Sequence, residues 1–235
     1  MNLILLFPDD FIAPDRARLR GRRVEHVIAV HHAGVGNVLR VGRINDRVGS
    51  GRVTMLTSTT LEMDVVLDEL PPAALPVTLL LALPRPKSLK RIMQAVAALG
   101  VKRIVLMNSW RVEKSYWLSP AVSEAALREQ LILGLEQARD TILPEVCLRR
   151  RFKPFVEDEV PQLTEGSLPL VAQPAATEPC PRHVQRPVTV AVGPEGGFIA
   201  YEVDLLARQG FLAVSLGPRP LRTEHAIAAL LGRLF

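Results

Sequence analysis

Two short loops rich in glycine and proline carry the residues best placed to do chemistry. Gly193-Pro194-Glu195-Gly196-Gly197 follows the β-branched run 187–192, and Gly217-Pro218-Arg219-Pro220-Leu221-Arg222 follows the apolar run 211–216. Neither loop contains lysine, and neither of the common glycine motifs that bind phosphate occurs in the chain. Such loops offer backbone groups at close approach, which favours a flat heteroaromatic ligand such as adenine. Ordinary βα turns are the alternative interpretation of either loop alone.

The sequence predicts that each loop leads from a strand into a helix. The first helix covers 199–209 and stops at Gly210, and the second begins after Thr223, a plausible cap. Two such units place both loops at the same edge of a parallel sheet, which is where open α/β sheets bind ligands.

The two loops together resemble the signature of a known family. Val192-Gly193-Pro194-Glu195-Gly196-Gly197-Phe198, followed by Leu216 to Glu224, is similar to the paired motifs of the RsmE family, the uridine N3-methyltransferases of small-subunit (16S) ribosomal RNA in the SPOUT class. The resemblance implies an S-adenosylmethionine enzyme with an N-terminal PUA-like β-barrel and a C-terminal SPOUT methyltransferase domain. It also implies that the C-terminal domain is knotted, with its last helix threaded through a loop.

The resemblance further implies which residues hold the cofactor and which act on the RNA. The cofactor residues would be Ala172, Gly193, Pro194, Glu195, Gly196, Leu216, Gly217, Leu221, Arg222, Thr223 and Ala226. Uridine N3 carries a proton at neutral pH, so the site needs a base or a cation that stabilises the anion. Arg222 is the candidate cation because it keeps its charge. Glu224 is the candidate base, although a Glu in a first helical turn can simply favour the helix dipole. Glu195 could hold the cofactor or the last helix, or only shape its turn.

The order of predicted elements from residue 77 onward indicates an α/β fold. Strands are expected at 77–83, 103–107, 145–148 and 168–172, with helices over 87–99 and from Ser119-Pro120 to about Ala138. This alternation predicts a largely parallel sheet. The proline-rich segment 71–76 is the expected linker between a domain at 1–70 and a methyltransferase domain at 77–235.

Residues 1–70 are expected to form a small, basic β-barrel. Short apolar runs separated by Gly, Asn and Asp turns predict the strands, with a short helix around 25–30. Between Arg16 and Arg52 there are nine arginines against Glu25 and Asp46, which suits contact with RNA phosphates. A merely solvated basic face is the alternative. The expected RNA-binding residues are Arg20, Arg22, Arg23 and, in the second domain, Arg111.

Composition indicates a globular cytoplasmic protein with a polyanionic partner. The 235 residues carry a net charge of +5, and their two cysteines, Cys147 and Cys180, lie far apart, as in a reducing compartment. No run is long and apolar enough to span a membrane. His31-His32 has no third ligand at suitable spacing, so no metal is expected.

Several positions depart from the family pattern and keep other functions open. Ala95, Ala98, Asp140 and His225 stand where the family usually has other residues. The alternatives are a methyltransferase acting on a ribose 2'-hydroxyl or another base, and a non-catalytic RNA-binding protein that retains the fold. The resemblance also implies a homodimer. The apolar stripe of the last helix (Ala226, Ile227, Leu230, Leu231 and Leu234) could serve that interface or complete the monomer's core.

Overall fold

The computed structural model describes residues 2–235 of the chain, and their contacts divide it into two units. Of the described residues, the first unit comprises 2–73 together with 132–143, and the second comprises 74–131 and 144–235. The division falls inside the predicted linker 71–76. The return of residues 132–143 to the first unit has no signal in the sequence, because it depends on contacts between distant segments.

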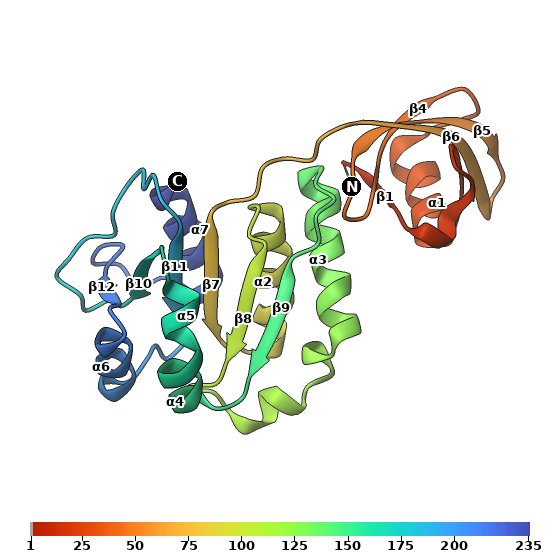
Figure 1. Cartoon of the computed structure of the whole chain (residues 1–235). Coiled ribbons are helices and arrows are strands. Elements are labelled where there is room, and N and C mark those ends of the chain that lie inside the picture. The colour runs from red at the N-terminus through yellow and green to blue at the C-terminus, as the bar shows by residue number, and fades with distance from the viewer. Residues whose placement is uncertain (1) are drawn as a thin grey trace. The chain divides into compact units, whose positions relative to one another are not determined.

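The first unit is built on a six-stranded, mostly antiparallel sheet (Figure 1). Its strands pair in the order β1-β4-β5-β6-β3-β2, and only β1 with β4 is parallel. They are β1 (Ile4–Leu6), β2 (Phe11–Ala13), β3 (Arg16–Arg20), β4 (Val38–Arg43), β5 (Val48–Leu56) and β6 (Thr60–Glu69). Among the described residues the strand order of this sheet runs from β1 at one end to β2 at the other. The sheet and α1 (Arg22–His26) enclose one apolar core that draws residues from most of these strands.

The predicted basic segment around Arg18 is itself a strand. In β3 the arginines alternate with Ala17 and Leu19, which are completely buried. This is the two-residue period of a half-buried strand, with charged side chains on the outer face.

Several of the arginines expected to meet RNA are ion-paired within the first unit. Arg23 forms two hydrogen bonds to Asp10, of 2.6 and 2.7 Å, and a third to the Leu5 carbonyl. Arg22 donates to the buried carboxylate of Glu136, and Arg16 and Arg18 both pair with Glu62. Arg20 is exposed. The local excess of positive charge is therefore smaller than the sequence between Arg16 and Arg52 indicates.

The ion pair between Arg22 and Glu136 should make stability depend on pH. Burial raises the pKa of the Glu136 carboxyl, and the Arg22 guanidinium opposes this effect. The folded protein therefore binds this proton more tightly than the unfolded chain, so its stability falls as pH rises above the carboxyl's ordinary value of 4.5. Arg22→Ala raises the folded pKa further and should cost about 1–2 kcal/mol at neutral pH, with little loss at pH 4.

Urea unfolding of the Arg22→Ala variant at both pH values measures this difference. Arg20→Ala, on the same basic segment, is the control and should leave the free energy of unfolding unchanged at either pH. An equal loss for Arg22→Ala at pH 4 and pH 7 would contradict the role of the ion pair.

The second unit is a six-stranded sheet in which every described pair of strands is parallel (Figure 1). The strand order is β12-β10-β11-β7-β8-β9. The strands are β7 (Val77–Ala82), β8 (Arg103–Met107), β9 (Glu145–Arg149), β10 (Leu168–Ala172), β11 (Val188–Val192) and β12 (Leu212–Val214). The predicted α/β class with a parallel sheet is confirmed. The strands before the two glycine-rich loops are not neighbours, since β10 lies between them, but their loops do leave the same edge.

Helices connect these strands and cover the sheet. They are α2 (Pro86–Ala98), α4 (Phe152–Pro154), α5 (Val160–Thr164), α6 (Ala200–Arg208), α7 (Thr223–Leu234) and the first part of α3 (Glu124–Ala138), whose residues from 132 onward belong to the first unit. The predicted start of α3 is wrong by several residues. Ser119 caps a short 3₁₀ turn at Pro120–Val122 by accepting a hydrogen bond from the Ala121 N–H. Ser123 then provides a second cap, accepting from the Ala126 N–H.

Asp140 is buried in the turn that ends α3, where it accepts a hydrogen bond from the Ile142 N–H. Arg139, just before it, adopts a left-handed conformation with φ of 59°. The departure from the family pattern at Asp140 thus has a local structural role. Nothing in the structure explains the histidine at the exposed position 225.

The terminal helix α7 turns its apolar stripe inward. Ile227, Leu230, Leu231 and Leu234 are buried, and α7 packs against α2. This stripe completes the monomer's core, so it is not an open surface for a second copy.

The long loop 173–187 is bonded to the end of α7. The N–H groups of His183 and Val184 donate to the carbonyls of Arg233 and Leu234, and the Arg233 guanidinium donates to the Cys180 carbonyl. These contacts hold the end of the last helix against this loop.

Candidate active site

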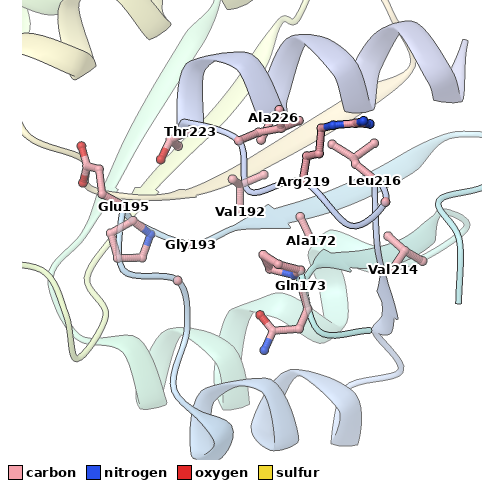
Figure 2. Close-up of a pocket in the computed structure, with 15 residues that line it drawn as sticks. Ala172, Gln173, Val192, Gly193, Glu195, Val214, Leu216, Arg219, Thr223 and Ala226 are labelled. Atoms are coloured by element: carbon pink, nitrogen blue, oxygen red, sulfur yellow. The ribbon is translucent and has the colours of Figure 1, made fainter. Parts of the chain in front are cut away.

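A cleft opens at the carboxyl ends of β10, β11 and β12 (Figure 2). The last residues of these strands, Ala172, Val192 and Val214, form part of its floor. The full lining is Ala172, Gln173, Pro174, Val192, Gly193, Pro194, Glu195, Gly197, Val214, Leu216, Gly217, Arg219, Leu221, Thr223 and Ala226. Parallel pairing brings the two glycine-rich loops together here, and the loops contribute Gly193, Pro194, Glu195, Gly197, Gly217, Arg219 and Leu221 to the lining.

The first loop is packed tightly around Gly193. A Cβ atom built at this position would lie 2.9 Å from the Phe198 nitrogen and 3.0 Å from the Gly197 carbonyl carbon. Real Cβ atoms do not approach backbone so closely, so the loop requires glycine here. Gly197 and Gly217 have φ of 71° and 116°, the left-handed region that glycine favours.

Glu195 ties the first loop to the segment after β7. Its Oε1 accepts a hydrogen bond of 3.1 Å from the Arg85 N–H, and its side chain also lines the cleft (Figure 2). Among the described lining residues it is the one carboxylate, and Arg219 is the one guanidinium. The cleft is thus predominantly apolar with one charge of each sign at its border.

The loop after β8 is bonded both to α6 and to the first glycine-rich loop. The buried Glu202 of α6 accepts hydrogen bonds from the Trp110 N–H at 2.7 Å and from the Ile199 N–H at 3.0 Å. The Arg111 guanidinium donates to the Gly196 carbonyl. These contacts fix the glycine-rich loop between its neighbours on the same edge of the sheet.

Glu202→Ala should therefore destabilise the protein and loosen the cleft. The substitution leaves the N–H groups of Trp110 and Ile199 without their acceptor, which should cost about 1–3 kcal/mol. For a chain of this size the melting temperature should fall by about 2–4 °C for each kcal/mol. Asp204→Ala, at an exposed position of the same helix, is the matched control. Equal melting temperatures for the two variants, measured by calorimetry, would show that Glu202 does not hold the loops.

Glu224 lies in the first turn of α7 and pairs with Arg91 of α2 at 2.9 Å. A hydrogen bond from its own backbone N–H, with help from Arg91, lowers the pKa of the Glu224 carboxyl. A carboxylate with a lowered pKa is a weaker base, so this geometry favours a tie between α2 and α7. Arg222 is exposed and precedes the helix, with its carbonyl accepting from the N–H groups of His225 and Ala226.

Comparison with known proteins decides the family. Residues 71–234 match the family model described as an RNA methyltransferase domain. A Treponema pallidum protein named ribosomal RNA small subunit methyltransferase E is 31% identical over 97% of this chain and 88% of its own length. The chain belongs to the ribosomal RNA small subunit methyltransferase E family. The RsmE resemblance of the paired loops is therefore confirmed.

Solved structures share the fold over nearly the whole chain. A Neisseria gonorrhoeae ribosomal RNA small subunit methyltransferase E, bound to S-adenosyl methionine, superposes with a TM-score of 0.76 at 22% identity, covering 98% of this chain and 95% of that one. A Legionella pneumophila protein with bound SAM gives 0.74 at 23% identity, covering 98% and 96%. These matches confirm the SPOUT-type fold of the family.

Most of the cofactor residues expected from the RsmE resemblance line the cleft. Two do not: Gly196 faces the Arg111 side chain, and Arg222 lies outside the lining. The lining also includes residues that were not among the expected cofactor residues, namely Gln173, Pro174, Val192, Gly197, Val214 and Arg219. Val192, Gly197 and Arg219 belong to the two motifs and could have been inferred from them. Gln173 and Pro174 follow β10, whose position between the other two strands had no sequence signal.

Arg111, expected to bind RNA, is exposed, and its guanidinium donates a hydrogen bond to the Gly196 carbonyl.

In the part of the chain that the structure describes, no three His, Cys, Asp or Glu side chains gather as a metal site would require. No helix among residues 2–235 is long and apolar enough to cross a membrane.

Proposed function

We propose that this family member transfers the methyl group of S-adenosylmethionine to N3 of a uridine in small-subunit (16S) ribosomal RNA. The observation that carries the proposal is that residues of both family motifs line one cleft at the ends of three parallel strands. The Neisseria and Legionella structures hold S-adenosylmethionine, which supports the choice of methyl donor.

The cleft has the chemistry that an adenosyl ligand requires. Val192, Leu216 and Leu221 offer apolar walls for a flat purine, while glycine backbones allow close hydrogen bonds. The Glu195 carboxylate at the border suits the positive charge of the methionine part of the cofactor. The bound cofactor would supply an activated methyl group on a sulfonium.

The protein's own residues must position the uridine and manage one proton. The N3 proton would pass to solvent water or hydroxide, N3 would then bond to the methyl carbon supplied by the cofactor, and the sulfur would leave as the neutral thioether of S-adenosylhomocysteine. We assign to Arg222 the stabilisation of the uridine anion, because its guanidinium stays charged and it stands beside Thr223 of the lining. We assign to Glu224 the positioning of α7 through Arg91 rather than proton removal.

The rest of the proposal concerns RNA, assembly and location. The first unit is proposed to contact RNA phosphates through Arg20 and other exposed arginines. Arg22 and Arg23, which are bonded to Glu136 and Asp10, contribute mainly to stability. Arg111 is proposed to reach RNA from the second unit. A homodimer whose site is completed by the partner, and a cytoplasmic location alongside the ribosomal RNA, complete the proposal.

Transfer of a labelled methyl group tests the proposed activity. Incubation with small ribosomal subunits lacking the native modification and with methyl-labelled S-adenosylmethionine should put label into the RNA. A protein that binds subunits but transfers no label would favour the non-catalytic alternative.

A further inference from the structure

Trp110 presents its indole to solvent from a loop that is firmly held. Its side chain is 79% exposed. Its backbone N–H is bonded to the buried Glu202, and its neighbour Arg111 is bonded to Gly196. The exposure therefore belongs to a fixed loop conformation. Trp117 in the same segment is only 9% exposed and donates its indole N–H to Asn108 at 2.9 Å.

Trp110 belongs to the loop after β8 and is not part of the cleft lining, but its loop is bonded to residues that border the cleft. Arg111 contacts Gly196, and the residues on either side of Gly196, Glu195 and Gly197, both line the cleft.

Exposed cations follow three neighbouring strands, β7, β8 and β9, at the sheet edge from which the Trp110 loop leaves, and the exposed carboxylate in that loop is Glu113. Arg85 follows β7, Lys114 lies in the loop after β8, and Arg150 and Arg151 follow β9, all of them exposed. The Arg150 guanidinium is held 5.4 Å from the centre of the Trp117 ring. An exposed aromatic ring among cations is the arrangement that binds single-stranded nucleic acid, where bases stack on the ring and cations contact phosphates.

We propose that Trp110 is a stacking platform for an unpaired base of the substrate RNA, next to the target uridine. The inference rests on the proposed function, since it takes the RNA substrate as given and adds the residue that orients it. Because Trp110 lies outside the cleft lining, the stacked base is a neighbour of the uridine that enters the cleft.

Binding of fluorescein-labelled single-stranded oligouridine to the full chain tests this. Trp110→Ala should weaken binding about tenfold or more, because it removes the ring on which a base stacks. Oligouridine is a suitable probe because such stacking is tolerant of base identity. Trp110→Phe should keep most of the affinity because it keeps a ring. Leu118→Ala removes another apolar side chain, 81% exposed in the same segment, and should change nothing. Cofactor affinity should be equal in all three variants.

An oligonucleotide of the same length with abasic positions separates stacking from phosphate contact. It should bind the wild-type chain more weakly than oligouridine, and Trp110→Ala should weaken it no further. Unchanged oligouridine affinity in Trp110→Ala would overturn the inference. A mass of Trp110→Ala in light scattering that differs from the wild-type mass would also overturn it, because Trp110 would then be part of a contact between protein chains. If the wild type transfers methyl groups and Trp110→Ala binds oligouridine as well as the wild type does, only this inference is contradicted. If binding depends on Trp110 but no methyl group is transferred, the proposed function is contradicted instead.

Discussion

Replacing Arg222 with alanine is expected to lower kcat about 100- to 1000-fold while leaving the affinity for S-adenosylmethionine nearly unchanged. The size follows from removing a charge that stabilises a developing anion. The unchanged affinity follows from the position of Arg222 outside the cleft lining. Single-turnover rates on small ribosomal subunits and calorimetric titration of the cofactor measure the two quantities. The loss should shrink as pH rises, because hydroxide then removes more of the N3 proton without help.

Glu224→Gln distinguishes this account from general-base catalysis. Glu224 forms a partly exposed ion pair with Arg91, and such pairs contribute little energy. The substitution should therefore lower kcat by less than about tenfold. The pH profile of the variant should keep the wild-type shape. A loss above 100-fold for Glu224→Gln, with a mild effect of Arg222→Ala, would exchange the two roles.

Gly193→Ala is expected to reduce S-adenosylmethionine affinity about 100-fold. The added Cβ would meet the backbone of Gly197 and Phe198 at about 3 Å, so the first glycine-rich loop must move. Displacements near 1 Å in a binding site have effects of this order. Calorimetric titration gives the affinity, and thermal melting shows whether the variant remains folded.

Gly196→Ala is the matched control for that substitution. A Cβ there would meet the Arg111 side chain at 2.9 Å, and a flexible side chain can move aside. Its affinity should fall by less than about tenfold. If Gly196→Ala abolished binding and Gly193→Ala preserved it, the cofactor would lie on the other side of this loop.

The strands of the second unit could be predicted well because each is a short apolar run bounded by strong breakers. β8 and β10 have the predicted bounds, since 103–107 and 168–172 are flanked by glycine, proline or polar residues. The order of the strands could not be predicted in the same way. The insertion of β10 between β11 and β12 depends on long-range pairing, and it brings Gln173 and Pro174 to the cleft.

In the first unit, the number of arginines along the sequence did not predict how many of them lack an acidic partner in the fold. The pairs of Arg23 with Asp10 and of Arg18 with Glu62 join residues from different elements, so a count along the chain cannot detect them. The same charges concealed β3, whose small and apolar residues alternate with arginine over only five positions. The start of α3 was misjudged because Ser119 and Ser123 are both good caps, and only the second begins the helix.

At the candidate site, the motifs predicted the lining better than they predicted the roles. Glu195, Glu202 and Glu224 each bond to a segment far away in the sequence, and such partners are visible only in the folded chain. Conversely, Gly193 was identifiable from sequence, because a tight turn next to a strand end commonly requires glycine.

Nucleoside analysis of the methylated RNA tests the central claim most directly. Small ribosomal subunits lacking the native modification would be incubated with the protein and S-adenosylmethionine, and the RNA would then be digested and examined by mass spectrometry. The account predicts one new nucleoside, N3-methyluridine, whose formation is lost in Arg222→Ala. A 2'-O-methylated nucleoside or a methylated base other than uridine would contradict it.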